Sequence, residues 1–276
     1  MKIIVVVDKD NKKKNQAIKD IKSIFKGHEL VEIAVSELDE FTFDKKIIKK
    51  EYFDFVLAVG GDGTIIKTAK TFYKYDMKIL AINIGQLGFL SGVDKIDALK
   101  KIKIKDINDS KIIKRDLLKC ELFRNGKRID SSYALNEFLL CSNEFGLMGK
   151  YDFSYGKDQH INTFHSDGII VSTETGSTAY AFSCGGPIIE NEAHCIMLIP
   201  IRSHSCNERA FILNDKKVIK TQILRSNQVL KVDGRDNKEL KLNDVLVFTK
   251  DKKQIKFIDM NNESFFERAL SRIKVL

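Results

Sequence analysis

The sequence predicts an α/β protein: a parallel α/β domain, then a mostly antiparallel β-rich domain, and a C-terminal helix that packs back on the first domain. Apolar runs of strand length alternate with helical spacing over the first hundred residues. Later, short β-type runs surround Asn125-Gly126, a strong hairpin signal. At 276 residues, the chain is long enough for two modest domains.

The first expected domain covers residues 1–110. Its alternation is typical of βαβ units around a parallel sheet, a Rossmann-like arrangement. Ligands of such sheets bind beyond the carboxyl ends of the strands, where the glycine-bearing loops 60–64 and 83–90 lie. The strands are expected at 2–7, 29–35, 53–59 and 77–83, and the helices at about 11–26 and 64–74.

The second expected domain covers residues 111–255 and is mostly antiparallel sheet, interrupted by one helix after Thr175-Gly176-Ser177-Thr178. Residues 256–276 form a tail with apolar residues at helical spacing, which we expect to return to the first domain. The β-type runs are 116–124, 128–135, 138–141, 168–173, 196–201, 218–224, 229–233 and 244–249.

Composition excludes several classes of protein. The balance of 47 Lys plus Arg against 38 Asp plus Glu is nearly all lysine scattered among acids, which favours solvated surface over a nucleic-acid face. The first apolar run, residues 3–7, is too short for a signal peptide or a membrane span. Five cysteines without a Cys-x-x-Cys pair argue against a disulfide framework and a zinc site, so we expect a reducing, cytoplasmic location.

The loop 60–64 reads Gly-Gly-Asp-Gly-Thr and joins an expected strand to an expected helix. Gly60, Gly61 and Gly63 lack the Cβ atoms that would keep a polyanion away, and they permit positive φ angles, so the loop can hold phosphate at the positive end of the helix. A carboxylate in this loop repels phosphate, so the presence of Asp62 requires a function other than phosphate binding. Asp62 can accept a proton from a hydroxyl during phosphoryl transfer; the alternative is a residue that only caps the helix.

The stretch from Asp167 to Pro187 is dense in small and hydroxylated residues. Thr175, Thr178 and Ser183 offer short donors and acceptors, and Tyr180 adds a flat face with a polar tip. This set suits a nucleoside, since stacking can hold the base while hydroxyls hold its edge and ribose. A plain Ser/Thr N-cap would explain only part of it.

These segments make the chain resemble the NAD kinases, which phosphorylate the 2′-hydroxyl of the adenosine ribose of NAD with ATP. The resemblance is collinear over nearly the whole chain. Gly-Gly-Asp-Gly-Thr alone is shared with lipid kinases, which leaves a lipid kinase and a non-catalytic dinucleotide sensor as alternatives. The resemblance is carried by residues 60–64, 83–90, 136–137, 167–187, 199–200, 204–205, 233–234 and 265–268.

The resemblance implies a role for each matching residue. Asp62 would be the proton acceptor, and Gly60, Gly61 and Gly63 would hold phosphates. Mg²⁺ or another divalent cation would accompany ATP, and the protein would be a homo-oligomer, a dimer or tetramer. The implied contacts to the dinucleotide come from Phe89, Asn136, Glu137, Asp167, Thr178, Ala179, Tyr180 and Ser183.

Three residues depart from the family pattern. Glu174 stands where proline is common, and we expect a minor effect. His165 stands where many members have arginine, which leaves the preference between NAD and NADH open. Arg235 follows Asp233-Gly234, and like Arg202 it is either a contact to substrate phosphate or a surface residue.

Overall fold

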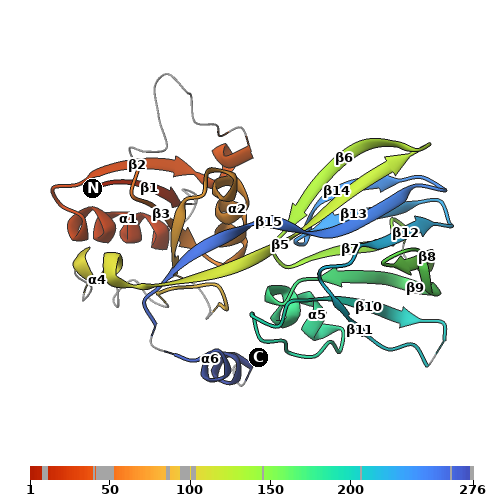
Figure 1. Cartoon of the computed structure of the whole chain (residues 1–276). Helices are drawn as coiled ribbons and strands as arrows, with labels where there is room; N and C mark the ends of the chain where they lie inside the picture. The colour runs from red at the N-terminus through yellow and green to blue at the C-terminus, as the bar shows by residue number, and fades with distance from the viewer. Residues whose placement is uncertain are drawn as a thin grey trace. The chain divides into compact units, whose positions relative to one another are not determined.

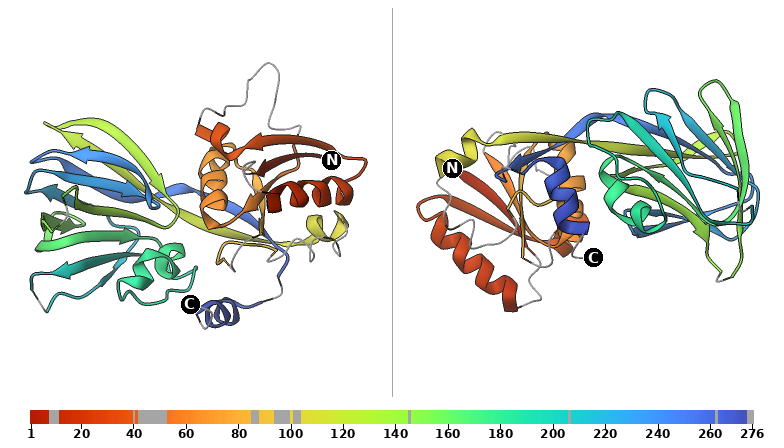
Figure 2. Two further views of the ribbon diagram at one scale, coloured as in Figure 1. Left: turned by 180° about the vertical axis from the view of Figure 1, so that it is seen from behind. Right: turned by 90° about the horizontal axis from the view of Figure 1, so that it is seen from below.

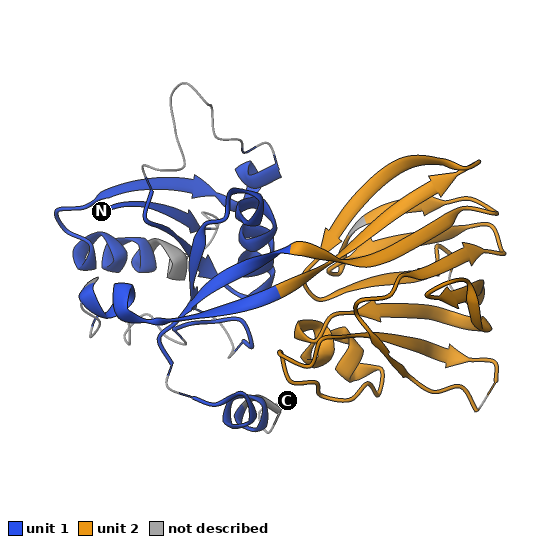
Figure 3. Cartoon of the chain, in the orientation of Figure 1, with its two compact units in different colours: residues 1–115, 253–276 blue, residues 116–252 orange. Residues whose placement is uncertain are grey.

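The computed structural model describes residues 1–7, 12–39, 41, 53–84, 88–93, 100, 104–144, 146–205, 207–261 and 263–273. It confirms the mixed α/β class, with parallel strands first and antiparallel strands later. The chain forms two compact units, residues 1–115 with 253–276 (unit 1) and residues 116–252 (unit 2), shown in Figure 3. From the sequence we expected the domain boundaries after residues 110 and 255.

Unit 1 contains a parallel sheet in the order β2-β1-β3-β4-β15 (Figure 1). Its helix α2 begins at Asp62, two residues earlier than expected, because Gly61 already serves as the N-cap. The elements are β1 (Lys2–Val7), α1 (Lys12–Ile24), β2 (Glu29–Ala34), η1 (Val35–Asp39), β3 (Phe55–Gly60), α2 (Asp62–Phe72), η3 (Tyr73–Tyr75), β4 (Lys78–Asn83), α4 (Ile104–Asp109) and α6 (Phe265–Ile273).

The central strand of unit 1, β3, is buried at every residue, which explains its unbroken apolar sequence. Helix α1 packs on the sheet through Ala17 and Ile21, and Phe25, the residue after the helix, belongs to the same core. Helix α2 lies against β3 and β4 (Figure 2), and its residues Ile65 and Phe72 are buried. Each such side chain contributes about 1.5–3 kcal/mol of burial free energy. The sheet is therefore held firmly, and the loops at its carboxyl edge start from fixed positions.

Unit 2 is an antiparallel sheet in which β9 pairs with β7, β8 and β10. Strands β5 and β15 run from one unit into the other. The elements are β5 (Lys111–Arg124), β6 (Lys127–Ala134), β7 (Glu137–Ser142), β8 (Gly149–Tyr155), β9 (Gln159–Ser172), η4 (Thr175–Thr178), α5 (Tyr180–Ser183), β10 (Cys195–Ser203), β11 (Phe211–Asn214), β12 (Ile219–Ile223), β13 (Gln228–Val232), β14 (Arg235–Leu240) and β15 (Val245–Asp259).

Aromatic residues fill the core of unit 2. The ring centroids of Phe138 and Phe248 are 5.6 Å apart, and those of Phe153 and Phe164 are 5.7 Å apart. Such pairs contribute about 0.5–1.5 kcal/mol beyond their buried area. This core fixes β7 and β9, from which the polar residues of the candidate site project.

Within the described ranges, no helix has the length and apolar character needed to cross a membrane. The cysteines that the structure describes are free thiols, namely Cys120, Cys141, Cys184 and Cys195.

Candidate active site

The glycine loop of unit 1 lies between the end of β3 and the start of α2. A Cβ atom on Gly60 would come within 2.6 Å of the Thr64 side chain, so only glycine fits there. Gly61 is the N-cap, and its carbonyl accepts hydrogen bonds from the N–H groups of Thr64 and Ile65. The expectation of positive φ angles in this loop was wrong, because α2 starts so early that helical geometry alone orients its first N–H groups.

Asp62 is the first residue of α2 and not its cap, and among the described residues no side chain caps this helix by a hydrogen bond. The interpretation of Asp62 as a plain helix cap therefore does not fit. Its Oδ1 atom is buried, and the positive end of the helix stabilises a carboxylate in this first turn.

The loop after β4 packs against this carboxylate. Gly60 and Asn83 are partners in the parallel register of β3 and β4, so the two strands end side by side. A Cβ on Gly88 would lie 2.1 Å from Asp62 Oδ1 and 2.9 Å from Asn83 Nδ2. The structure thus brings the two glycine-bearing loops together at Asp62. Phe89 is half-buried beside them, and residues 85–87 of this loop lie outside the described ranges.

In unit 2, Glu137 is the first residue of β7 and is only 5% exposed. Its Oε2 atom is buried and has no hydrogen-bond partner within the part of the chain that the structure describes. Burial, with the charge of Asp233 adding to it, raises the pKa of Glu137 to about 8. A buried carboxyl oxygen of this kind can form a hydrogen bond with a ligand hydroxyl.

Asp233 fixes the backbone around Glu137. Its carboxylate accepts hydrogen bonds from the N–H groups of Leu135, Asn136 and Glu137, at 3.1, 2.8 and 3.3 Å. Asp233 itself has a φ of 49°, a left-handed conformation that Asp tolerates better than most residues. The backbone conformation at Asn136 and Glu137 is therefore stabilised by Asp233, which lies 97 and 96 residues away from them in the sequence.

The segment around η4 follows β9 directly. Several of its hydroxyls bond within the protein: Thr173 Oγ1 donates to the Leu135 carbonyl, and Ser177 Oγ contacts the backbone of Ile189. A Cβ on Gly176 would fall 2.3 Å from the Asn136 carbonyl oxygen, so the segment packs tightly on the Asn136 turn. Some of the hydroxyl groups that suggested a binding pocket, those of Thr173 and Ser177, therefore stabilise the local backbone instead.

A pocket of about 560 Å³ opens beside this segment in unit 2. Three residues predicted from the sequence line it, namely Asp167, Tyr180 and Ser183. Tyr180 is 45% exposed, and partial burial with a hydrogen bond to Cys184 raises the pKa of its hydroxyl. The other lining residues are Leu139, Cys141, Cys184, Pro200, Ile201 and Arg202.

The remaining predicted residues have different positions. Thr175 is buried in η4, while Thr178 and Ala179 are half-buried at its end. The side chain of His165 is exposed on β9, and its carbonyl accepts a hydrogen bond from His204 N–H. Arg235 is exposed at the start of β14, and neither it nor His165 lines the pocket. Of the two arginines left open by the sequence, Arg202 is the one at the pocket.

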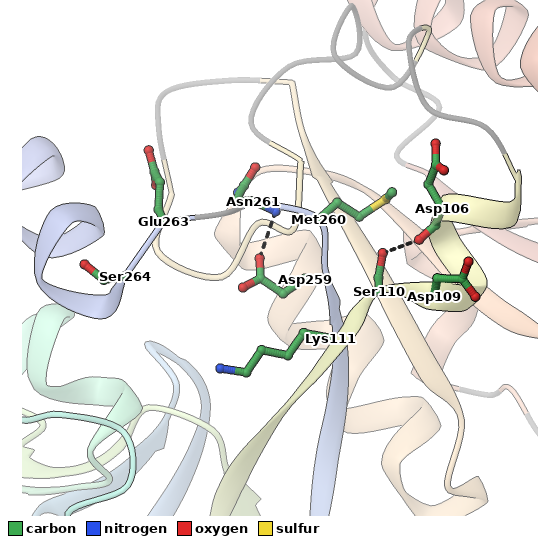
Figure 4. Close-up of a pocket in the computed structure, with 9 residues that line it drawn as sticks. All are labelled: Asp106, Asp109, Ser110, Lys111, Asp259, Met260, Asn261, Glu263 and Ser264. Carbon is green, nitrogen blue, oxygen red and sulfur yellow. Dashed lines mark hydrogen bonds between the residues drawn. The ribbon is translucent and has the colours of Figure 1, made fainter.

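A second pocket, of about 570 Å³, lies in unit 1 (Figure 4). Asp106, Asp109, Asp259 and Glu263 line it, and Asp259 accepts a hydrogen bond from Asn261 N–H. Lys111 also lines it, and Asp259 forms an ion pair with Arg268, but the carboxylates outnumber these cations, so the pocket favours nucleotide phosphates less than the glycine loop does.

Comparison with known protein families gives two matches that together span most of the chain. Residues 2–110 match the ATP-NAD kinase N-terminal domain, and residues 135–260 match the ATP-NAD kinase C-terminal domain. An NAD kinase of Clostridium botulinum (strain 657 / Type Ba4) is 36% identical over 222 residues, covering 80% of this chain and 78% of the relative. An NAD kinase of Caldanaerobacter subterraneus subsp. tengcongensis is 32% identical over 216 residues, covering 78% and 76%.

Two solved structures share the fold. A yeast NADH kinase complexed with NADH superposes with a TM-score of 0.83 at 21% identity, covering 100% of this chain and 88% of that one. An NAD kinase from Archaeoglobus fulgidus in complex with ATP gives a TM-score of 0.75 at 22% identity, with 100% of both chains covered.

Proposed function

The chain belongs to the ATP-NAD kinase family, and on that premise we propose that it transfers the γ-phosphoryl group of ATP to the 2′-hydroxyl of the adenosine ribose of NAD, giving NADP and ADP. The observation that carries this proposal is the placement of Asp62. Its carboxylate lies at the N-terminus of α2, close to Gly88. The N–H groups at this end of the helix can bind phosphate, and the carboxylate beside them can accept a proton.

The chemistry follows from these groups. The 2′-hydroxyl oxygen forms a bond to the γ-phosphorus, the bond from that phosphorus to the β-phosphate oxygen breaks, and ADP leaves. Asp62 takes the proton of the hydroxyl, and its position matters more than its proton affinity. The first N–H groups of α2 and the backbone of Gly60, Gly61 and Gly63 hold phosphate oxygens.

Mg²⁺ or another divalent cation belongs to the same proposal as the partner of ATP, where its charge would neutralise the phosphates. At the loop, Asp62 supplies one carboxylate that could bind a cation, whereas the backbone N–H groups could not. One carboxylate fits a cation that is held mainly by the nucleotide phosphates.

We assign the dinucleotide to the unit 2 residues. Asp167, Tyr180 and Ser183 line a pocket large enough for part of a nucleotide. Glu137 supports the assignment, since its buried Oε2 would gain a partner from a ribose hydroxyl. We assign Asn136, in the turn before Glu137, and Thr178 and Ala179, at the end of η4, to the same dinucleotide site.

We further propose a homo-oligomer, a dimer or tetramer, located in the cytoplasm. Exposed Phe266 and Leu270 on α6 support self-association, since large apolar side chains exposed near each other favour burial in an interface. The free thiols support a reducing compartment. Light scattering of the purified protein would test the assembly, and a monomer at all concentrations would contradict it.

The activity is tested by incubating the purified protein with ATP, Mg²⁺ and NAD and measuring NADP with a dehydrogenase specific for NADP. We expect NADP formation that requires both substrates. A parallel reaction with diacylglycerol vesicles in place of NAD should give no phosphorylated lipid. Failure to form NADP above a protein-free control would overturn the proposal.

A further inference from the structure

A buried ion-pair network in unit 2 centres on Lys250, a residue of β15. Its Nζ atom lies 2.6 Å from Asp116 Oδ2, 2.6 Å from Glu174 Oε1 and 2.9 Å from Asp215 Oδ2. The side chains of these four residues are only 2–12% exposed. Three carboxylates from separate parts of the unit thus share one ammonium group away from solvent.

The network is strongly ionic. Burial alone would lower the pKa of Lys250, but hydrogen bonds to Asp116, Asp215 and Glu174 outweigh it and raise that pKa above its ordinary value. His194 lies at the edge, with its Nδ1 3.7 Å from Asp215. Asp116, His194 and Asp215 offer ligand atoms within 4.8 Å of one another, yet the ammonium already contacts both carboxylates. The cation of this cluster is therefore Lys250 itself.

Glu174 connects the network to the segment beside the pocket. It immediately precedes η4, and its Oε1 also accepts a hydrogen bond of 2.6 Å from the backbone N–H of Cys195 on β10. One carboxylate thus ties the start of the Thr175–Ser183 segment to two strands, β10 and β15. Buried charge-assisted hydrogen bonds of this kind are short, strong and directional.

The backbone of Glu174 has a φ of −59° and a ψ of −38°, so its φ is the value that a proline ring would fix. Glutamate leaves that angle free in the unfolded chain, and here the side chain supplies the constraint through its contacts. Cys195 and Lys250 are far from Glu174 in the sequence, so these contacts are visible only in the fold.

We propose that Glu174 is a positioning residue for the dinucleotide: through Lys250 and the Cys195 N–H it holds the Thr175–Ser183 segment in the conformation that binds NAD. This inference rests on the proposed function. It places Glu174 outside direct substrate contact and assigns its effect to Tyr180 and Ser183, the pocket residues at the far end of the segment.

The test compares two variants that each remove one carboxylate 2.6 Å from the same ammonium. Glu174→Ala removes the one on the segment, and Asp116→Ala removes the one on β5. We expect Glu174→Ala to raise the KM for NAD about tenfold, equivalent to about 1.4 kcal/mol, with the KM for ATP within twofold. Asp116→Ala should leave the KM for NAD within twofold, although both variants lower the melting temperature.

Glu174→Gln supplies the conservative comparison, because it keeps an acceptor for the Cys195 N–H and loses only the charge toward Lys250. Its KM for NAD should rise about threefold. If Glu174→Ala does not fold, Glu174→Gln is compared with Asp116→Asn instead, and a rise confined to Glu174→Gln supports the inference.

An unchanged KM for NAD in the folded Glu174 variants, or an equal rise in the matched Asp116 variants, would overturn the inference. The wild-type protein is assayed in the same series. NADP formation by wild type with no difference among the variants refutes only the positioning role, whereas no NADP from wild type refutes the proposed function.

Discussion

Gly88 passes so close to Asp62 that a Cβ atom added to it would fall 2.1 Å from the carboxylate oxygen Oδ1. No side chain fits at that point without moving the carboxylate or the loop. The absence of a side chain at Gly88 therefore leaves the room that the carboxylate of the proposed proton acceptor occupies.

Gly88→Ala should displace the carboxylate of Asp62 without changing the type of residue at position 62. We expect kcat for NADP formation to fall about 100-fold, the loss typical of a misplacement of about 1 Å at a reacting group. Steady-state kinetics with NAD and ATP would measure it.

The control for that variant is Gly126→Ala at the tip of the β5–β6 hairpin. Gly126 has a φ of 73° and open space around it, so alanine there costs about 1–2 kcal/mol of stability through strain alone. Its kcat should stay at the wild-type level. A Gly88→Ala enzyme with unchanged kcat would show that Asp62 has room to adjust.

Glu137 should make the stability of the protein depend on pH. Its pKa is about 8 in the folded state against an ordinary value of 4.5, so the folded state binds the extra proton between these values. The free energy of unfolding should therefore fall as pH rises from about 4.5 to about 8, by at most about 1.4 kcal/mol per unit. Urea unfolding across this range would measure it.

Glu137→Gln removes this titration while keeping the size of the side chain. Subtracting its unfolding free energies from those of wild type isolates the contribution of Glu137 from those of all other groups. We expect the difference to grow in favour of the Glu137→Gln variant up to about pH 8 and then level off. Parallel curves for the two proteins would refute the raised pKa.

Asp233 should be irreplaceable by alanine and nearly replaceable by asparagine. Alanine leaves the N–H groups of Leu135, Asn136 and Glu137 without their acceptor and adopts a φ of 49° poorly. We expect Asp233→Ala to lose about 2–4 kcal/mol of unfolding free energy. Asp233→Asn keeps one oxygen acceptor and tolerates the left-handed conformation, so it should lose about 1 kcal/mol. Equal losses in urea unfolding would contradict this account.

The strands of unit 1 could be predicted because parallel strands covered on both faces have unbroken apolar sequences, as in β3. Strand β8 was missed, because only Tyr151 and Phe153 supply large buried side chains between polar neighbours. In β9 only residues 168–173 were expected, since the first half of this long strand is polar and partly exposed. Strands β11 and β14 are short or polar and gave no clear pattern.

The candidate site could be proposed from the sequence where its residues are contiguous. Residues 60–64 and the block ending at Tyr180 are local motifs with their own chemistry. The contacts of Asp233 with Asn136 and of Lys250 with Glu174 could not be predicted, because each joins residues that are far apart in the sequence. Only the fold reveals which distant side chains hold a local motif in place.

The most direct test of the central claim is the rate of NADP formation from ATP and NAD by wild type and by Asp62→Asn, measured side by side. The variant keeps the shape of the side chain, so it should fold and bind NAD like wild type. Its kcat should fall by about 10²–10⁴ because the proton acceptor is gone. A variant that forms NADP at the wild-type rate would contradict the role of Asp62.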